Sequence, residues 1–198
     1  MLLQDRLKAY NLILASGSPR RHQLLKEAGL SFCPAPRYSV DESYPDDMPA
    51  QEVAAYLSAM KAEHYPFKKG DKDIIITADT TVVVDDNVLG KPINREHATD
   101  MLRMLSDKWH TVITGVTFII SGQAHTFSSS TRVKFKALTD EEIGYYVNNF
   151  SPLDKAGSYG IQEWIGYIGI ESIDGSYYNV MGLPVQRVCT ELERLLSL

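Results

Sequence analysis

The sequence predicts a single α/β domain that spans residues 1–198, and three observations carry this prediction. Continuous apolar runs at residues 12–15 and 73–78 are typical of strands that are buried on both faces of a sheet. Segments with apolar residues at helical spacing alternate with these runs along the chain. No repeat, linker or low-complexity stretch divides the sequence, and 198 residues can bury a substantial core without a second domain.

Composition and charge narrow the class of protein. A hydrophobic content of 44% and a charged content of 23% are ordinary for a globular domain. The formal charge of −5 argues against a nucleic-acid polymer as the main partner, although a single nucleotide would need only a local positive cluster. No stretch approaches the ~18 apolar residues of a membrane span, and the N-terminus lacks the apolar core of a signal peptide. With two cysteines that show no metal-site spacing, we expect a cytoplasmic protein with no membrane partner.

The first half of the chain predicts strands and helices in alternation. Pro19 suits the first position of a helix, with Ser18 as its N-cap and Gly29 as its stop. The expected elements are a strand at 12–15, a helix from 19 to 29, a loop with a short strand at 31–49, a helix from about 47–49 to 64, a strand at 73–78 that ends at 79–81, and a hairpin of 82–84 and 88–89.

The second half continues the same pattern. Thr139 and Glu142 form a capping box, which predicts that a helix begins there. The expected elements are a helix after 94, a hairpin of 109–120 and 124–136, a helix from 139, a glycine-rich stretch at 154–160, two short strands that flank 173–175, and a last helix from 184.

The turn between the first strand and the first helix is a candidate anion site. The first N–H groups of a helix have no internal partner, and the helix dipole makes that end electropositive. Gly17 would let a ligand approach the turn closely, and Arg20 and Arg21 add positive charge. These features predict a cradle for a triphosphate, with Ser16 at its start. The alternative is a capped helix whose arginines point to solvent.

Three further charged residues are candidates for catalysis or ligand binding. Asp79 directly follows an apolar strand, where a carboxylate can bind magnesium or act as a general base; alternatively it only caps a turn. Lys61 extends the apolar stripe of its helix, so its ammonium either reaches solvent or points into a site. Lys91 is confined between Gly90 and Pro92.

Several familiar signatures are missing from the chain. There is no Walker A loop, dinucleotide-binding fingerprint, serine-hydrolase elbow or zincin motif. The five histidines fit no metal-ligand spacing, so we expect structural or surface roles for them.

Four segments together resemble the Maf family of nucleoside triphosphate pyrophosphatases. They are Ala15-Ser16-Gly17-Ser18-Pro19-Arg20-Arg21, Ala78-Asp79-Thr80, Gly90-Lys91-Pro92, and Asp154-Lys155-Ala156-Gly157-Ser158-Tyr159-Gly160-Ile161-Gln162. The resemblance implies a mixed sheet with flanking helices and two lobes around a cleft, as in the inosine triphosphate pyrophosphatases. It also implies a homodimer and the hydrolysis of a nucleoside triphosphate to the monophosphate and pyrophosphate, with Mg²⁺ or Mn²⁺.

The resemblance also assigns roles to single residues. Asp79 matches the proton acceptor, Glu42 a second carboxylate that with Asp79 would hold the metal, and Lys91 a catalytic lysine. The phosphate-binding group is expected to consist of Ser16, Arg20, Arg21 and Lys61, and the base-selecting group of Arg20, Thr80 and Gln162. Whether Asp79 accepts a proton or binds the metal stays open at this point.

The choice of substrate also rests on the resemblance. Residues 159–162 are similar to the subgroup that acts on dTTP and UTP, whereas residues 164–167 depart from the small residues common there. The alternatives are the same reaction on 7-methyl-GTP or another modified base, and a nucleotide-sensing regulator of septum formation.

Overall fold

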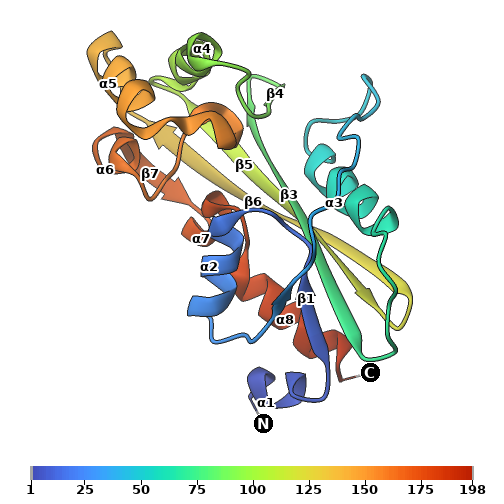
Figure 1. Ribbon diagram of the computed structural model, residues 1–198. Helices are drawn as coiled ribbons and strands as arrows, with labels where there is room; N and C mark the ends of the chain where they lie inside the picture. The colour runs from blue at the N-terminus through green and yellow to red at the C-terminus, as the bar shows by residue number, and fades with distance from the viewer. Residues whose placement is uncertain (1, 198) are drawn as a thin grey trace. The chain divides into compact units, whose positions relative to one another are not determined.

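The computed structural model describes residues 2–197 and has a mixed sheet with flanking helices (Figure 1). The strands are β1 (Asn11–Leu14), β2 (Cys33–Pro34), β3 (Asp73–Val84), β4 (Asn87–Leu89), β5 (Trp109–Ile120), β6 (Gln123–Phe135) and β7 (Ile170–Asp174). The helices are α1 (Leu3–Leu7), α2 (Pro19–Glu27), α3 (Val53–Glu63), α4 (Arg95–Leu105), α5 (Asp140–Phe150), α6 (Trp164–Gly169), α7 (Tyr177–Met181) and α8 (Val185–Leu195), with 3-10 turns η1 (Pro152–Asp154) and η2 (Ala156–Ser158).

The sheet contains both parallel and antiparallel pairs. Its strand order is β2-β1-β3-β5-β6-β7, and β4 pairs with β3. Strand β1 is parallel to β2 and β3, whereas β4 is antiparallel to β3 and β7 is antiparallel to β6. The predicted α/β class with a mixed sheet and flanking helices is therefore confirmed.

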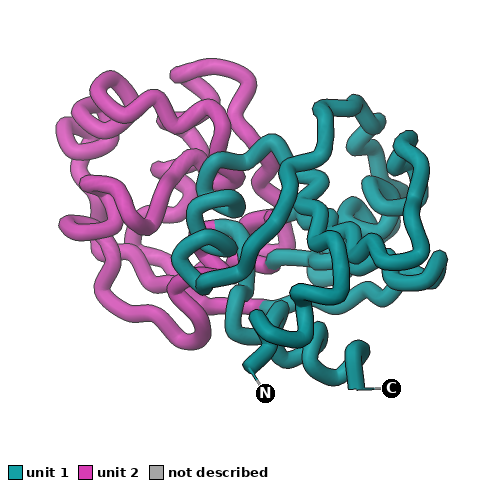
Figure 2. The backbone as a smooth tube through the Cα atoms, turned by 60° about the horizontal axis from the view of Figure 1, so that its bottom comes forward, with its two compact units in different colours: residues 1–79, 114–129, 182–198 teal, residues 80–113, 130–181 magenta. Residues whose placement is uncertain are grey.

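The chain divides into two compact units (Figure 2). Unit 1 consists of residues 1–79, 114–129 and 182–198, and unit 2 of residues 80–113 and 130–181. Strands β3, β5 and β6 each contribute residues to both units.

The core of unit 1 is built on the predicted apolar strands. Ile74, Ile75 and Ile76 of β3 are fully buried, as expected for a strand covered on both faces. Helix α3 packs directly on the backbone of β5 at Gly115. The approach is so close that a Cβ at Gly115 would lie 2.1 Å from the carbonyl oxygen of Ala54. Only glycine permits this approach, and it fixes the helix that carries Lys61.

In unit 2, the hairpin of β3 and β4 and the start of helix α5 both follow local sequence signals. Asp85 and Asp86 connect β3 to β4 with φ of 48° and 62°, the left-handed pair that a tight two-residue hairpin requires. The capping box of Thr139 and Glu142 is present at the start of α5, as predicted.

Three local predictions are wrong. Strand β3 does not end at residues 79–81 but continues to Val84, because the β-branched run that follows Asp79 is well suited to a strand. Helix α3 begins at Val53 rather than near 47–49, where the chain forms turns instead. The second of the two strands expected around 173–175 is helix α7. Ser18 occupies the N-cap position of α2, as predicted, although its side chain makes no capping hydrogen bond; its backbone N–H donates to Ser16 Oγ.

His110 is buried in unit 2, in agreement with the structural role expected for it. Its Nε2 lies 2.7 Å from the hydroxyl of Tyr159, and its ring contacts those of Phe135 and Tyr159 edge-on. Burial lowers the pKa of His110 from 6.5 to about 4.

This burial predicts a pH dependence of stability. Between pH 6.5 and about 4 the unfolded chain binds a proton at His110 that the folded chain does not, so the free energy of unfolding falls as the pH falls through this window. At pH 5 the contribution is a loss of about 2 kcal/mol relative to pH 7.5. Urea unfolding at pH 7.5 and at pH 5 measures this fall in the free energy of unfolding. His110→Gln should lack the part of the fall that comes from His110, whereas the control His125→Gln should retain it. Equal losses in all three proteins would contradict the prediction.

Within residues 2–197, no helix is both long enough and apolar enough to span a bilayer.

Candidate active site

The turn between β1 and α2 is organised around Ser16. Ser16 Oγ accepts from the backbone N–H of Ser18 at 3.3 Å and from Nη1 of Arg21 at 3.2 Å. His22 Nε2 donates to the carbonyl oxygen of Ser16 at 2.7 Å. A Cβ at Gly17 would meet no atom within 4 Å apart from its chain neighbours, so the turn has open space at this position.

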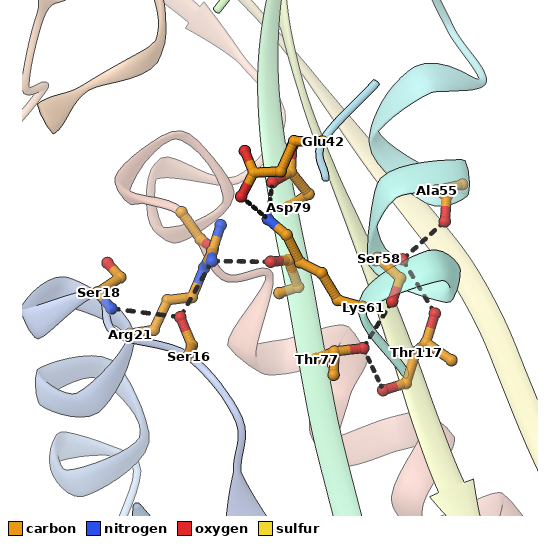
Figure 3. A network of polar contacts seen from close by, with 12 residues as sticks. Ser16, Ser18, Arg21, Glu42, Ala55, Ser58, Lys61, Thr77, Asp79 and Thr117 are labelled. Carbon is orange, nitrogen blue, oxygen red and sulfur yellow. Dashed lines mark hydrogen bonds and ion pairs between the residues drawn. The ribbon is translucent and has the colours of Figure 1, made fainter. Parts of the chain in front are cut away.

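Arg21 does not point freely to solvent. Its Nε donates to the carbonyl oxygen of Gly182 at 2.8 Å, and its Nη1 donates to that of Ala78 at 2.9 Å as well as to Ser16 (Figure 3). Burial lowers the pKa of Arg21, and the charge of Asp79 opposes this shift. Arg21 therefore ties α2 to the residue before Asp79 and keeps a positive charge there. Arg20, the other arginine of the turn, is half-buried.

Lys61 joins the two candidate carboxylates. Its Nζ forms an ion pair with Asp79 Oδ1 and another, of 2.9 Å, with Glu42 Oε1 (Figure 3). The side chains of Lys61 and Asp79 are 16% and 13% exposed, whereas that of Glu42 is 47% exposed. The ammonium thus points into a site rather than to bulk water, which decides between the two alternatives for this residue. Asp79 is not a turn cap, because it lies inside β3.

Buried hydroxyl groups hold α3 beside β3. Thr77 Oγ1 donates to the carbonyl oxygen of Ser58 at 2.7 Å, and Ser58 Oγ lies 2.9 Å from Thr117 Oγ1 (Figure 3). Thr77 and Asp79 are two residues apart on a strand, so both face the same way. The helix therefore contacts this face of β3 twice, through Ser58 to Thr77 and, one turn later, through Lys61 to Asp79.

The segment that carries Glu42 is attached to the end of α3. The hydroxyl of Tyr38 donates to the carbonyl oxygen of Lys61 at 2.8 Å. The Tyr38 ring packs edge-on against those of Tyr65 and Phe67 at 5.8 and 6.1 Å. This attachment brings Glu42 to the same ammonium as Asp79, although the two are distant in sequence.

The remaining candidates, Thr80, Lys91 and Gln162, belong to unit 2. Lys91 is exposed, and the preceding carbonyl, of Gly90, accepts from the backbone N–H of Gly157 at 3.1 Å. Thr80 is half-buried. Gln162 Oε1 is buried and has no hydrogen-bond donor among the described residues. A buried acceptor without a donor is costly, so this oxygen is an exception among the buried polar atoms of unit 2.

Sequence reasoning identified the charged groups but missed the residues that place them. Tyr38, Ser58, Thr77 and Gly115 belong to no motif. The only available signal was a hydroxyl, that of Thr77, inside a run that is otherwise apolar.

Comparison with known proteins gives a family for the whole chain. The family model described as Maf-like protein matches residues 11–195. A protein of Phocaeicola vulgatus named dTTP/UTP pyrophosphatase is 49% identical over 191 residues, which are 96% of this chain and 99% of the relative. A protein of Parabacteroides distasonis with the same name is 50% identical over 189 residues, which are 96% of this chain and 98% of the relative. Among solved structures, a nucleoside-triphosphatase, or dITP/XTP pyrophosphatase, of Mycobacterium abscessus is 12% identical with a TM-score of 0.42, over 95% of this chain and 100% of that one.

Proposed function

The chain belongs to the family of Maf-like proteins, and on that premise we propose that it hydrolyses pyrimidine nucleoside triphosphates, dTTP and UTP among them, to the monophosphate and pyrophosphate. The observation that carries the proposal is the group of Lys61, Asp79 and Glu42 in unit 1, where one ammonium is held by two carboxylates. The names of relatives about half identical over nearly the full length support the choice of substrate.

The proposed reaction is attack by water on the α-phosphorus. The bond between the α-phosphorus and the bridging oxygen breaks, and pyrophosphate leaves with the bond's electron pair. Asp79 is the proposed proton acceptor, since Lys61 and the rigid strand hold its carboxylate in a fixed orientation. Glu42 and Lys91 complete the proposed catalytic group.

The phosphate groups would be bound by the turn before α2. A triphosphate carries about four negative charges, and its cleavage is catalysed mainly by positioning and charge stabilisation. We assign phosphate binding to Ser16, Arg20, Arg21 and Lys61, with backbone N–H groups of the open helix start as further donors.

The base would be selected by Gln162, with Thr80 and Arg20. The buried Oε1 of Gln162 lacks a donor, and the N3–H of uracil or thymine is a donor of the required kind. At the ring position where uracil and thymine present N3–H, cytosine and adenine present an acceptor nitrogen, so at that position either base would face the Gln162 acceptor without a donor.

The donor set is compatible with Mg²⁺ or Mn²⁺. Asp79 and Glu42 converge on one cationic group, and hard divalent cations prefer carboxylate oxygen. Within residues 2–197 no cluster of three His, Cys, Asp or Glu side chains could hold a metal, so phosphate oxygens and water would supply the other ligands. When bound, the cation would neutralise charge on the triphosphate.

We further propose that residues 1–198 act as one catalytic domain and that the protein is a cytoplasmic homodimer. The family model that extends from residue 11 to residue 195 across both units supports the single catalytic domain.

The test is an activity panel on the purified protein. Canonical and modified triphosphates are incubated with Mg²⁺ or Mn²⁺, and phosphate and pyrophosphate are measured separately. The proposal requires pyrophosphate as the product and kcat/KM highest for dTTP and UTP. Release of phosphate alone would contradict the proposed reaction. A preference for 7-methyl-GTP or inosine triphosphate would contradict the proposed substrate class.

Gln162→Ala is predicted to reduce the preference for dTTP over ATP by at least about tenfold, because the lost acceptor contact is made only with the matching base. The ratio of the two kcat/KM values measures this effect. Gln123→Ala, at the exposed first residue of β6, is the matched control and should keep the ratio of the parent protein. An unchanged ratio in Gln162→Ala would remove Gln162 from base selection.

A further inference from the structure

Unit 2 contains a buried ammonium that the proposed reaction does not use. Only 8% of the Lys155 side chain is exposed, and its Nζ lies 2.8 Å from Asp154 Oδ1 and 3.0 Å from Glu163 Oε1. Removing a lysine from water is costly unless partners compensate, so a side chain in this position indicates a network rather than a surface charge.

Glu163 extends the network to helix α5. The hydroxyl of Tyr146, which is fully buried, donates to Glu163 Oε2 and accepts from the backbone N–H of Gly160 at 3.0 Å. Burial and the Glu163 carboxylate raise the pKa of Tyr146, so its hydroxyl keeps the proton that it donates.

Gly160 is enclosed by the same groups. A Cβ at this position would lie 2.8 Å from Glu163 Cδ, and the carbonyl oxygen of Gly160 accepts from the backbone N–H of Glu163 at 2.9 Å. Gln162 therefore lies in a short segment whose two ends, Gly160 and Glu163, are both held by the Tyr146 hydroxyl.

We propose that Lys155, Glu163 and Tyr146 are positioning residues that fix the segment 160–162 and thereby set the base selectivity of the enzyme. This inference rests on the proposed function, in which Gln162 reads the base. The network acts through Gln162 and touches no reacting atom. An amide can accept from one base only if its orientation is fixed, since a rotated amide would present donors instead. The buried ion pair supplies specificity rather than stability in this arrangement.

The test compares Tyr146→Phe with Tyr145→Phe. Both remove one hydroxyl from adjacent positions of α5, but Tyr145 is half exposed and its hydroxyl lies outside the network. In Tyr146→Phe we expect kcat/KM for dTTP to fall about tenfold, mainly through KM, with little change for ATP. The selectivity for dTTP over ATP should fall by the same factor, whereas Tyr145→Phe should match the parent protein.

Amide hydrogen exchange tests the network independently of any substrate. Exchange at residues 160–162 should accelerate at least about tenfold in Tyr146→Phe, because the acceptor of the Gly160 N–H is lost. Glu163→Gln, which keeps an acceptor for Tyr146 but loses the charge opposite Lys155, replaces Tyr146→Phe if that variant does not fold.

The outcomes separate the inference from the function on which it rests. Equal losses for dTTP and ATP would indicate a merely structural role and would overturn the inference, as would unchanged exchange at 160–162. If the parent protein does not cleave dTTP or UTP, the proposed function fails, while the exchange measurement still decides whether the network fixes this segment.

Discussion

Asp79→Asn is expected to leave the protein folded while kcat for dTTP falls at least ~100-fold, the usual scale of general acid–base catalysis. The amide cannot accept the proton of the attacking water, and it is a poorer ligand for a divalent cation. Folding should survive, because Lys61 keeps its ion pair with Glu42 and asparagine has the same size as aspartate.

The matched control is Asp73→Asn at the start of the same strand. Asp73 accepts from Asn11 Nδ2 and from the backbone N–H of Gly70, and it lies at the other end of the predicted apolar run from Asp79. Its replacement should leave kcat near that of the parent protein. A folded Asp79→Asn protein with near-normal kcat would remove Asp79 from the mechanism.

Lys61→Met is expected to lower kcat/KM for dTTP by at least ~100-fold, since a charge-assisted contact to phosphate and the orientation of Asp79 are lost together. Methionine retains most of the apolar stem of the lysine side chain. Without the ammonium, however, Asp79 and Glu42 would lose the cation that bridges them, and the two like charges would repel each other more strongly. Thermal unfolding should therefore show a lower melting temperature as well.

A second substitution separates these two effects. Glu42→Gln in the Lys61→Met background removes the repulsion and should restore much of the melting temperature without restoring activity. Lys69→Met, at an exposed position after α3, controls for the loss of one positive charge. Activity is not the readout of this double variant, because Glu42 belongs to the proposed catalytic group; a melting temperature no higher than that of Lys61→Met would show that repulsion between the carboxylates does not cause the loss.

The candidate site could be predicted in part because its charged residues lie in short motifs. Strand, turn and helix signals around Ser16 and Pro19 are local, and they predicted an open helix start with arginines beside it. The motifs could not predict the partner of each charge. Lys61 was compatible with solvent or with a site, and only the docking of α3 on β3 and β5 decided between them. That docking depends on Gly115, Thr77 and Tyr38, which no motif contains.

Local patterns in the sequence predicted the α/β class, the order of most strands and helices, and the residues that we propose to bind a nucleoside triphosphate. These properties follow from apolar periodicity, caps and turn residues, which act over a few positions of the chain. The continuation of β3 past Asp79 and the ion pairs of one ammonium with Asp79 and Glu42 became visible only in the folded chain. The tertiary structure also decided that a buried network of Lys155, Glu163 and Tyr146 encloses the segment of Gln162. The reason is that ion pairs and buried hydrogen bonds join residues distant in sequence, and their partners are chosen by packing.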